Sequence, residues 1–462
     1  MMQTSTVVRL LALVLSSALV QPAVAQTTRL DPTFQIPQIR SGASSGVVRD
    51  VVQQADGKYV IGGTFSTING VRARNLARLH ADGTLDAAFT ANCPANGTVS
   101  SLALQPNGSI LVGGSFDSLA AGQRRGVGRL LPSGTLDGAF DANLPSGLPI
   151  VQVAALPGGD VLARTSQSPV YTMPPPKGLY RLSGQTGQND PAFQQAVQVN
   201  HFVVQADGRI VTGGGGGSYV LMHLLARLLP DGSLDPSYPP ATTYFSSNTY
   251  QVAVDEQNNI YRLGTGNTLA GLTGPGIVQN DWGSLSPLAF QRQPNGRILL
   301  AGLATGAGPS TARLLPNGQQ DASYQPAAGP TGPGQVLRML VQPNGAILMA
   351  GSFAQAGATP VFGLVRMLDV NVLSAKDKQP AAGVVAWPVP ATTHLNLRLT
   401  PAAAPQQLQL LDGLGRALLA RVVPAATTTL ALEVAALPAG VYTLRVSSAQ
   451  AAPVSQRIVL QR

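Results

Sequence analysis

QPNGSILVGGSF, at residues 105–116, is the stretch that decides the fold, because it returns along the chain. Close copies are QADGKYVIGGTF at 54–65, QADGRIVTGG at 205–214 and QPNGAILMAGSF at 342–353, and weaker ones lie at 156–163, 255–264 and 293–302. The turn of each copy carries a glycine or its substitute, at Gly57, Gly108, Gly159, Gly208, Asn259, Gly296 and Gly345. The steps are 51, 51, 49, 51, 37 and 49 residues, so we expect seven units, of which the fifth is degenerate.

A second phrase follows the first and carries an arginine and an aspartate eight residues apart. It is clearest at 78–86 (RLHADGTLD), 129–137 (RLLPSGTLD), 227–235 (RLLPDGSLD) and 313–321 (RLLPNGQQD). Its Pro-Asp-Gly or Pro-Asn-Gly centre fits a type I turn with a bulge, which joins two strands of a hairpin. Two hairpins, or four short strands, in about fifty residues predict one blade of a β-propeller.

Other repeat folds fit less well. A β-helix has shorter repeats, a leucine-rich repeat shows a Leu/Asn ladder that is missing here, and independent sandwiches need roughly 100 residues each. We therefore expect an all-β fold, with a propeller of seven blades, or of six if the fifth unit does not form one.

The composition agrees with a folded, turn-rich protein. Gly 51 and Pro 36 make 87 of 462 residues, and 44% of the chain is hydrophobic while 11% is charged, which is unlike a disordered chain. The net charge is +9, but no basic run occurs, so we expect no nucleic-acid partner. The single cysteine, Cys93, excludes an internal disulfide and a multi-cysteine metal site, and we expect it to be buried.

Residues 1–25 are typical of a signal peptide. They hold Arg9, an apolar stretch from Leu10 to Val20, and an Ala-x-Ala cleavage site that ends at Ala25. Nothing later reaches about eighteen uninterrupted apolar residues, so we expect no transmembrane anchor. The sequence predicts a mature protein outside the cytoplasm.

A second domain follows the propeller, which we place at residues 26–370. Residues 371–384 hold Lys376, Asp377, Lys378 and Pro380 without an apolar period, as a linker does. Beyond the linker, residues 385–462 hold short alternating strands at 395–399, 408–411, 430–434, 441–446 and 457–460. About eighty residues of this kind predict a small Ig-like β-sandwich.

Both parts resemble known families. The core DG-x-x-L-x-GG-x-F, with a tail ending in Phe89, Phe140 or Tyr238, resembles the delta-sixty repeats of bacterial β-propellers over about residues 28–370. The motifs at 387–391 (WPVPA), 411–416 (LDGLGR), 437–446 (LPAGVYTLRV) and 457–462 (RIVLQR) resemble the type A sorting domain of the type IX secretion system, although Val389 replaces the usual Asn. This resemblance implies a Bacteroidota-type cargo that meets the type IX secretion machinery in the periplasm and ends extracellular or on the outer cell surface.

Few residues are suited to catalysis. A glycosidase needs two carboxylates at one cleft, but only Glu256 and Glu433 are glutamates, and ten of the 21 acidic residues already have a place in the repeats. The unexplained acids of the propeller are Asp50, Asp117, Asp141, Asp160, Asp255, Glu256 and Asp281. The histidines His80, His201, His223 and His394 lack metal-ligand spacing. We assign no catalytic, cofactor-binding or metal residue and no cofactor, while a Ser-His-Asp arrangement stays open, since its members lie far apart in sequence.

Two functions remain open. The leading hypothesis is a secreted or surface-displayed, non-enzymatic propeller that binds a macromolecule, a glycan or a protein. The alternative is an extracellular hydrolase or lyase that acts on a polysaccharide at the channel mouth, where loops of several blades converge. Three or more unexplained polar residues converging there would favour the enzyme, and a lining of backbone and small residues would favour binding.

The second phrase also predicts contacts. A three-residue turn at 81–83 places Arg78 opposite Asp86, and the same spacing recurs in the other copies. The last unit has Arg366 without a following hairpin strand, whereas residues 30–34 (LDPTF) are the end of a unit without its beginning. We expect residues 28–34 to form the outer strand of the blade that contains Arg366, with Asp31 near that arginine and Asp369 not used, which closes the ring.

Overall fold

The structure is a computed structural model of the full chain. It describes residues 26–145, 147–166, 178–194, 197, 199–214, 222–238, 241–243, 249–254, 259–264, 268–271, 278–279, 285–293, 296–304, 310–316, 319–325, 329–331, 334–342, 345–369, 384–387, 393–399, 404–411, 416–438, 440–448 and 451–460. The predicted signal peptide, and all but the last residue of the predicted linker, lie outside these residues.

Seven sheets hold the main strands of the described N-terminal part and follow one another along the chain, beside three small sheets of strands two or three residues long. The first three contain β4 (Val47–Gln53), β5 (Tyr59–Thr64) and β8 (Leu76–Leu79); β9 (Val99–Leu104), β10 (Ile110–Gly114) and β13 (Val127–Leu130); β14 (Ile150–Ala155), β15 (Val161–Thr165) and β16 (Leu179–Leu182). The next three contain β17 (His201–Val204), β18 (Ile210–Gly213), β19 (Met222–Leu228) and β20 (Ala241–Thr243); β21 (Thr249–Val254), β22 (Ile260–Gly264), β23 (Thr268–Gly271) and β24 (Val278–Gln279); β25 (Leu285–Arg292), β26 (Ile298–Ala304) and β27 (Thr311–Leu314). The last contains β30 (Val336–Val341), β31 (Ala346–Gly351), β34 (Leu364–Asp369) and β1 (Gln26–Leu30).

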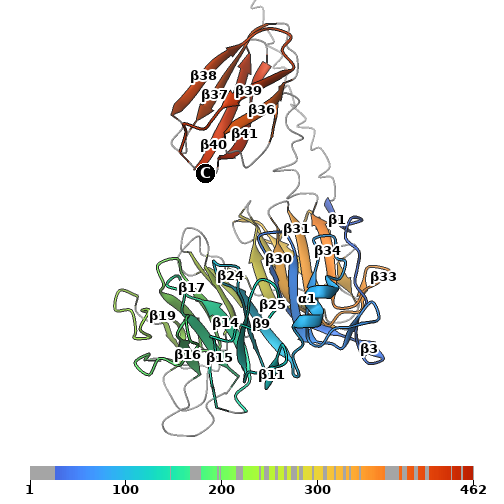
Figure 1. The fold of residues 1–462 in the computed structure, drawn as a ribbon, viewed down its shortest axis with the longest axis vertical. Helices are drawn as coiled ribbons and strands as arrows, with labels where there is room; N and C mark the ends of the chain where they lie inside the picture. The colour runs from blue at the N-terminus through green and yellow to red at the C-terminus, as the bar shows by residue number, and fades with distance from the viewer. Residues whose placement is uncertain are drawn as a thin grey trace, which may run out of the picture.

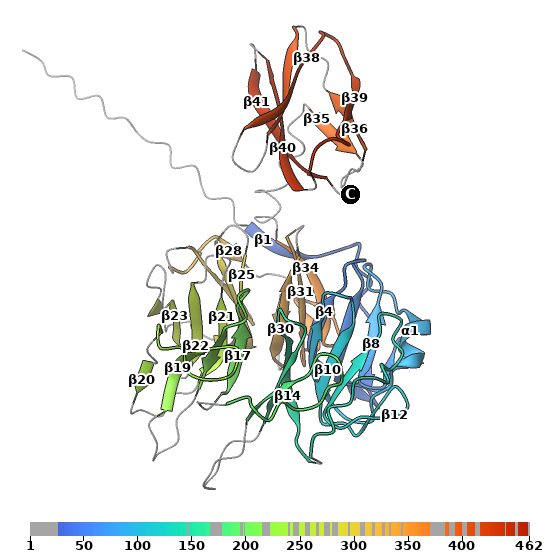
Figure 2. The same cartoon turned by 60° about the vertical axis from the view of Figure 1, so that its left-hand side comes forward.

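These sheets form a ring. The first strand of each sheet lies beside the first strand of the next, and β30 lies beside β4. Figures 1 and 2 show the sheets standing next to one another, and Figure 2 labels β30 and β4. The predicted all-β propeller is therefore confirmed. Its blade number stays a prediction, because parts of the fourth, fifth and sixth sheets lie outside the described residues.

The outer strand of most blades is shorter than the sequence analysis expected. In place of a fourth strand, a single bridge joins residue pairs such as Leu79 with Leu85 and Leu130 with Leu136. The aspartate that follows ends the strand: the Asp86 carboxylate accepts the Phe89 N–H and caps α1 (Ala87–Asn92), the one helix among the described residues. Short strands in small antiparallel sheets connect the main strands: β2 (Ile39–Ser41), β3 (Ser44–Ser45), β6 (Thr67–Ile68), β7 (Val71–Arg72), β11 (Ser118–Leu119), β12 (Gly122–Gln123), β29 (Pro330–Thr331), β32 (Gln355–Ala356) and β33 (Thr359–Pro360). The short strand β28 (Tyr324–Gln325) instead pairs parallel with β1 at the edge of the last sheet.

The repeated Gly-Gly is explained by close packing. A Cβ on Gly62 would lie 2.4 Å from Val99 Cγ1 of the next blade, and one on Gly63 would lie 1.9 Å from the Val47 carbonyl oxygen of its own first strand. Because the first glycine has no side chain, the neighbouring blade can pack directly against this strand. The second glycine in the same way allows the first strand of its own blade to come close.

The turn before this strand is as predicted at Gly108, whose φ is +82°, but the assignment of Asn259 is wrong. Val254 pairs with Ile260 in the same way as Leu104 pairs with Ile110, so Asn259 corresponds to Ser109, one residue after the turn position.

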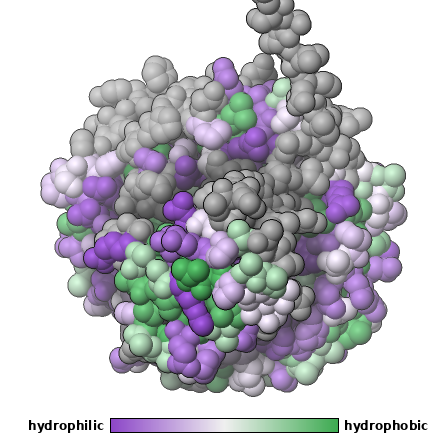
Figure 3. Space-filling model, turned by 90° about the horizontal axis from the view of Figure 1, so that it is seen from above, coloured by the Kyte–Doolittle hydropathy of each residue, from purple (hydrophilic) through white to green (hydrophobic). Residues whose placement is uncertain are grey.

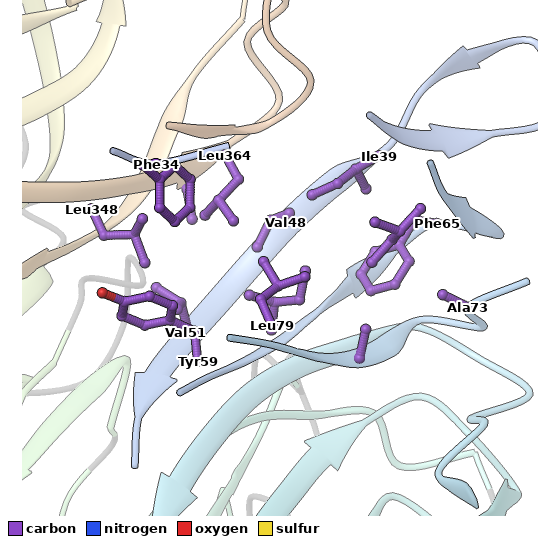
Figure 4. Close-up of a cluster of buried hydrophobic side chains, with 14 residues drawn as sticks. Phe34, Ile39, Val48, Val51, Tyr59, Phe65, Ala73, Leu79, Leu348 and Leu364 are labelled. Atoms are coloured by element: carbon purple, nitrogen blue, oxygen red, sulfur yellow. The ribbon is translucent and has the colours of Figure 1, made fainter. Parts of the chain in front are cut away.

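The N-terminal segment closes the ring as predicted. Its strand β1 pairs antiparallel with β34, with Leu30 opposite Met367, and Asp31 Oδ2 lies 2.7 Å from Arg366 Nε. The strand spans Gln26–Leu30 and not 28–34, because the Asp31 carboxylate accepts the Thr33 N–H and turns the chain. Figure 4 shows the buried cluster at this junction, where Phe34 packs with residues of the first and last blades. The Asp369 side chain lies outside what is described.

The C-terminal part contains two further sheets. One is built of β35 (Val384–Trp387), β36 (His394–Leu399) and β39 (Thr429–Glu433), and the other of β38 (Ala417–Val423), β37 (Gln406–Leu411), β40 (Gly440–Ser448) and β41 (Ala451–Leu460). They enclose one apolar cluster that includes Leu397, Leu410 and Leu444, as in a small β-sandwich. Over the described residues, no helix is long and apolar enough to cross a bilayer.

The surface mixes polar and apolar side chains, as the view from above shows (Figure 3). Large apolar side chains that stand exposed among the described residues are Val71, Leu131, Leu418 and Val422. Cys93 is buried as predicted, and burial raises the pKa of its thiol to about 12.

Candidate functional site

The innermost strands share one irregularity. Most of them carry a one-residue bulge near the start, as between Val48 and Asp50, or between Ile150 and Gln152. The residue after the bulge pairs with the first residue of the repeated Gly-Gly or with its replacement, as Ser101 pairs with Gly113. We call these equivalent residues the inner ring: Asp50, Ser101, Gln152, His201, Gln251, Ala289 and Arg338.

Inner-ring side chains accept hydrogen bonds from the next blade. Five of the seven side chains accept the backbone N–H of the residue that follows the next ring position. The bulge leaves this N–H without a partner in the strand pairing. The distances are 2.8 Å from Leu102 N to Asp50 Oδ2, 3.1 Å from Val153 N to Ser101 Oγ, 3.2 Å from Phe202 N to Gln152 Oε1, 3.2 Å from Val252 N to His201 Nδ1, and 2.8 Å from Phe290 N to Gln251 Oε1.

Two members of the ring differ from the others. Ala289 has no polar group to offer, and Arg338 closes the ring through an ion pair, with its Nε 3.1 Å from Asp50 Oδ1. Asp50 is 6% exposed, and its Oδ1 also accepts the Val51 N–H, so the carboxylate is held from three sides. The polar residues that meet around the axis thus connect the blades.

His201 has an unusual electrostatic environment. Burial, followed by the positive charges of Arg164 and Arg338, lowers the pKa of His201 to about 3. Because its Nδ1 accepts the Val252 N–H, the proton of the neutral imidazole is on Nε2. His201 is therefore a neutral hydrogen-bond donor at neutral pH.

The arginines of the second phrase form a second set of interblade contacts. The predicted ion pairs are present, at 2.8 Å for Arg78–Asp86, 2.8 Å for Arg129–Asp137, 2.7 Å for Arg227–Asp235 and 2.8 Å for Arg313–Asp321. Two of these arginines also donate to turn carbonyls of the following blade: Arg78 donates to Pro132 O at 3.0 Å, and Arg129 donates to Gln185 O at 3.2 Å. Each guanidinium lies over an aromatic ring of its own unit, as Arg78 lies 4.0 Å from the centre of Phe89.

In the third unit the arginine pairs with a different aspartate. Arg181 Nη2 lies 2.7 Å from Asp160 Oδ2, and Asp190 is 3.9 Å away. Asp160, which the sequence left unexplained, thus replaces the usual aspartate. Burial would raise the pKa of the aspartates at positions 31, 86, 160 and 321, but hydrogen bonds and the paired cations outweigh it and lower all four.

The other unexplained acids are not brought together. Asp50 belongs to the inner ring, Asp141 lies 3.8 Å from Arg124, and no contact of the Asp117 carboxylate is described. The remaining ones, Asp255, Glu256 and Asp281, lie outside the described residues. Over the described part of the chain, no group of three or more His, Cys, Asp or Glu side chains could hold a metal ion.

The inner ring was missed by sequence reasoning, although a signal exists. Each ring residue stands seven residues before the turn position of its unit, as Asp50 precedes Gly57 and Arg338 precedes Gly345. Residue identity varies at this position, so a search for shared residues passes over it.

Family models match both parts of the chain. A beta-propeller domain of unknown function, DUF5122, matches residues 54–89, 105–140, 205–238 and 293–324. A secretion system C-terminal sorting domain matches residues 385–461. The chain carries DUF5122 propeller repeats and a C-terminal sorting domain. No curated protein matches its sequence.

Solved structures with a similar fold are distant in sequence. The extracellular domain of BT3049 from B. thetaiotaomicron, described as a hybrid two component system, is 13% identical over 95% of this chain and 58% of its own, with a TM-score of 0.48. PorZ, a surface component of the type-IX secretion system of Porphyromonas gingivalis, is 11% identical over 90% of this chain and 59% of its own, with a TM-score of 0.46. The chain thus spans less than two thirds of either. YCF48 bound to D1 peptide is 15% identical over 74% of this chain and 95% of its own, with a TM-score of 0.40.

Proposed function

We propose that this protein is a type IX secretion cargo that acts outside the cell as a non-enzymatic binding propeller. The observation that supports the non-enzymatic part is the inner ring, because five of its polar side chains are already engaged by the backbone of neighbouring blades. A catalytic acid or base must be free to exchange a proton with substrate. The sorting domain at residues 385–461 supports export to the surface or medium.

The proposed order of segments follows the sequence analysis. A signal peptide at 1–25 provides passage through the inner membrane, the propeller extends over 26–370, and a linker at 371–384 precedes the sorting domain at 385–462. The host is a member of the Bacteroidota, the secretion machinery is the partner of the sorting domain, and a glycan or protein is the ligand of the propeller.

Deleting residues 385–462 in a Bacteroidota host tests the export part. The truncated propeller should collect in the periplasm, because the signal peptide supplies only the first crossing. Its resistance to protease, compared with that of the full chain, controls for folding. Unchanged amounts in the medium or on the cell surface would contradict the proposal.

A glycan array and a panel of polysaccharides test binding against hydrolysis on the purified protein. Binding without turnover is the expected result. Turnover that is lost in Glu256→Gln or Asp281→Asn, while Glu433→Gln in the sorting domain keeps it, would instead establish a hydrolase or lyase.

A further inference from the structure

A proline covers the turn of the first phrase in three blades. The distances from a Cβ placed on the turn glycine are 3.3 Å for Gly108 and Pro132 Cγ, 3.6 Å for Gly208 and Pro230 Cγ, and 3.5 Å for Gly296 and Pro316 Cγ. Each of these prolines belongs to the second phrase of the same blade. The first blade has Ala81 in this place, 3.7 Å from a Cβ placed on Gly57. The two turns of one blade thus pack against each other.

The third blade lacks this cover. A Cβ on its turn glycine, Gly159, or on the preceding Gly158 would meet no atom within 4 Å. The turn of its second phrase contains no proline and is longer than the others, because Ser183 O accepts the N–H of Gly187, four residues on. In the second blade the same bond spans only the three residues from Leu131 to Gly134. The place that a proline fills in other blades is therefore open beside Gly159.

The open place belongs to a groove between the second and third blades. The groove has a volume of about 670 Å³, within the range of about 300–1,000 Å³ that is typical of ligand sites. Pro106 of the second blade and Pro157 of the third, both exposed, line it together with the backbone of Gly158 and Gly159. Two exposed amide side chains, Asn107 and Gln185, line it as well. The groove thus combines apolar ring surfaces with neutral hydrogen-bonding groups.

The charges in the groove are already paired. Its charged lining residues are Arg129 and Asp160. Arg129 Nε lies 2.8 Å from Asp137 Oδ2, and Asp160 Oδ2 lies 2.7 Å from Arg181 Nη2. The two amide side chains can both donate to and accept from the backbone of a peptide. The groove therefore suits an uncharged segment of polypeptide better than an ionic ligand.

We propose that this groove binds a proline-containing turn of a partner protein. The ring of the partner's proline packs against Gly158 and Gly159, where other blades place a proline of their own. The occupant of the equivalent place in the second, fourth and sixth blades thus identifies the chemistry of the ligand. The inference rests on the proposed binding function and narrows its ligand to a protein segment.

Calorimetric titration of the purified full chain with a peptide tests the groove. The probe is LLPNGQQ, the uncharged sequence of residues 314–320, and the control peptide has alanine in place of its proline. Both peptides are closed by a disulfide between added terminal cysteines, so that the turn persists in each and less ordering is needed on binding. The proline peptide should bind and the alanine peptide should not. No binding at millimolar peptide, or equal binding of the two peptides, would overturn the proposal.

Gly158→Leu is the decisive variant, because its side chain fills the groove. The variant should fold, since a Cβ at Gly158 meets open space and its φ lies outside the left-handed region. We expect at least about tenfold weaker binding of the proline peptide. Gly138→Leu is the matched control, because Gly138 is also exposed, with open space around it and an ordinary φ, but does not line the groove. Equal affinity of the wild type and Gly158→Leu would refute the site.

Hydrogen exchange provides a second readout. The bound peptide should slow exchange at residues 156–160 and 183–187, and leave residues 205–209 unchanged, because Pro230 already covers that turn. Equal protection of 205–209 would contradict the assignment.

The outcomes separate this inference from the proposed function. A glycan that binds the wild type while the proline peptide does not would overturn the inference and leave the proposed function standing. Turnover of a polysaccharide would overturn the proposed function, whereas peptide binding that Gly158→Leu abolishes would still establish the groove.

Discussion

Replacing Phe34 by alanine should loosen the strand that closes the propeller. Phe34 is 4% exposed, its ring meets Tyr59 edge-on with centroids 6.3 Å apart, and the Arg366 guanidinium lies 4.8 Å from its centre. It is the single aromatic residue of the closing segment 26–34. That segment starts at β1 and is continuous with the first blade, but it pairs with the last blade without a covalent connection to it.

The size of the effect follows from the burial of the ring. Truncating a buried phenylalanine to alanine costs about 3–5 kcal/mol, and losing the cation–π contact adds about 0.5–1 kcal/mol. Because the closing segment can detach while the rest of each sheet persists, we expect this cost to appear first as local opening. A loss of about 3–5 kcal/mol raises the detached population roughly a hundredfold to several thousandfold.

Hydrogen exchange of the peptide 26–36 measures this opening. The peptide includes the Asp31 N–H, which donates to Arg366 O at 3.0 Å, and the Gln35 N–H, which donates to Asp82 O at 2.7 Å. Both should exchange much faster in Phe34→Ala than in the wild type.

Phe140→Ala is the matched control. Phe140 occupies the same place in the second unit, is fully buried, and lies 4.6 Å from the Arg129 guanidinium. It should lower global stability without selectively speeding exchange in peptide 26–36. The reasoning is refuted if Phe34→Ala leaves that peptide protected, or if Phe140→Ala exposes it to the same degree.

Three further outcomes follow from the interblade contacts. Because the pKa of His201 falls from its ordinary 6.5 to about 3, the unfolded chain binds a proton that the folded one does not. Stability should therefore drop as pH falls through this window, by up to about 1.4 kcal/mol per pH unit, and urea titrations should show a flatter dependence for His201→Gln. A Cβ at Gly113 would lie 2.7 Å from Val153 Cγ1, so Gly113→Val should lower the melting temperature at a cost of about 1–3 kcal/mol, whereas Gly138→Ala, with open space around it, should not. Iodoacetamide should label Cys93 only after unfolding, and labelling of the native protein at the rate of a free thiol would contradict its burial.

Local spacing is what made much of the fold predictable. The eight-residue step from Arg78 to Asp86 sets a hairpin register by itself, and the pairing of Leu79 with Leu85 confirms it. The closing contact of Asp31 with Arg366 spans most of the chain, yet it was predictable because two incomplete repeats complete each other. In a repeat protein, a contact between distant residues can therefore be predicted from the local pattern of one complete repeat.

Contacts between blades were not predictable in the same way. The N–H of Leu102 reaches Asp50 only because a bulge shifts the register of the first strand, and bulges leave no fixed residue signature. The substitution of Asp160 for the usual partner of Arg181 depends on the shape of a lengthened turn at 183–187. The same lack of local constraint led to the wrong position for Asn259.

Residue identity differs more from blade to blade in the inner ring than in the two repeated phrases. The turn phrase and the Arg–Asp pair are held nearly constant, since each position is fixed by its own hairpin and by the blade beside it. Most inner-ring side chains accept one backbone N–H of the next blade, and an aspartate, a serine, a glutamine and a histidine can all do so. The position paired with the inner ring also varies: it is Gly113 in the second blade and Arg164 in the third. Chemistry that differs from blade to blade is therefore concentrated around the axis, and a ligand that distinguishes this propeller from other DUF5122 repeats must be recognised by the residues in which its own blades differ.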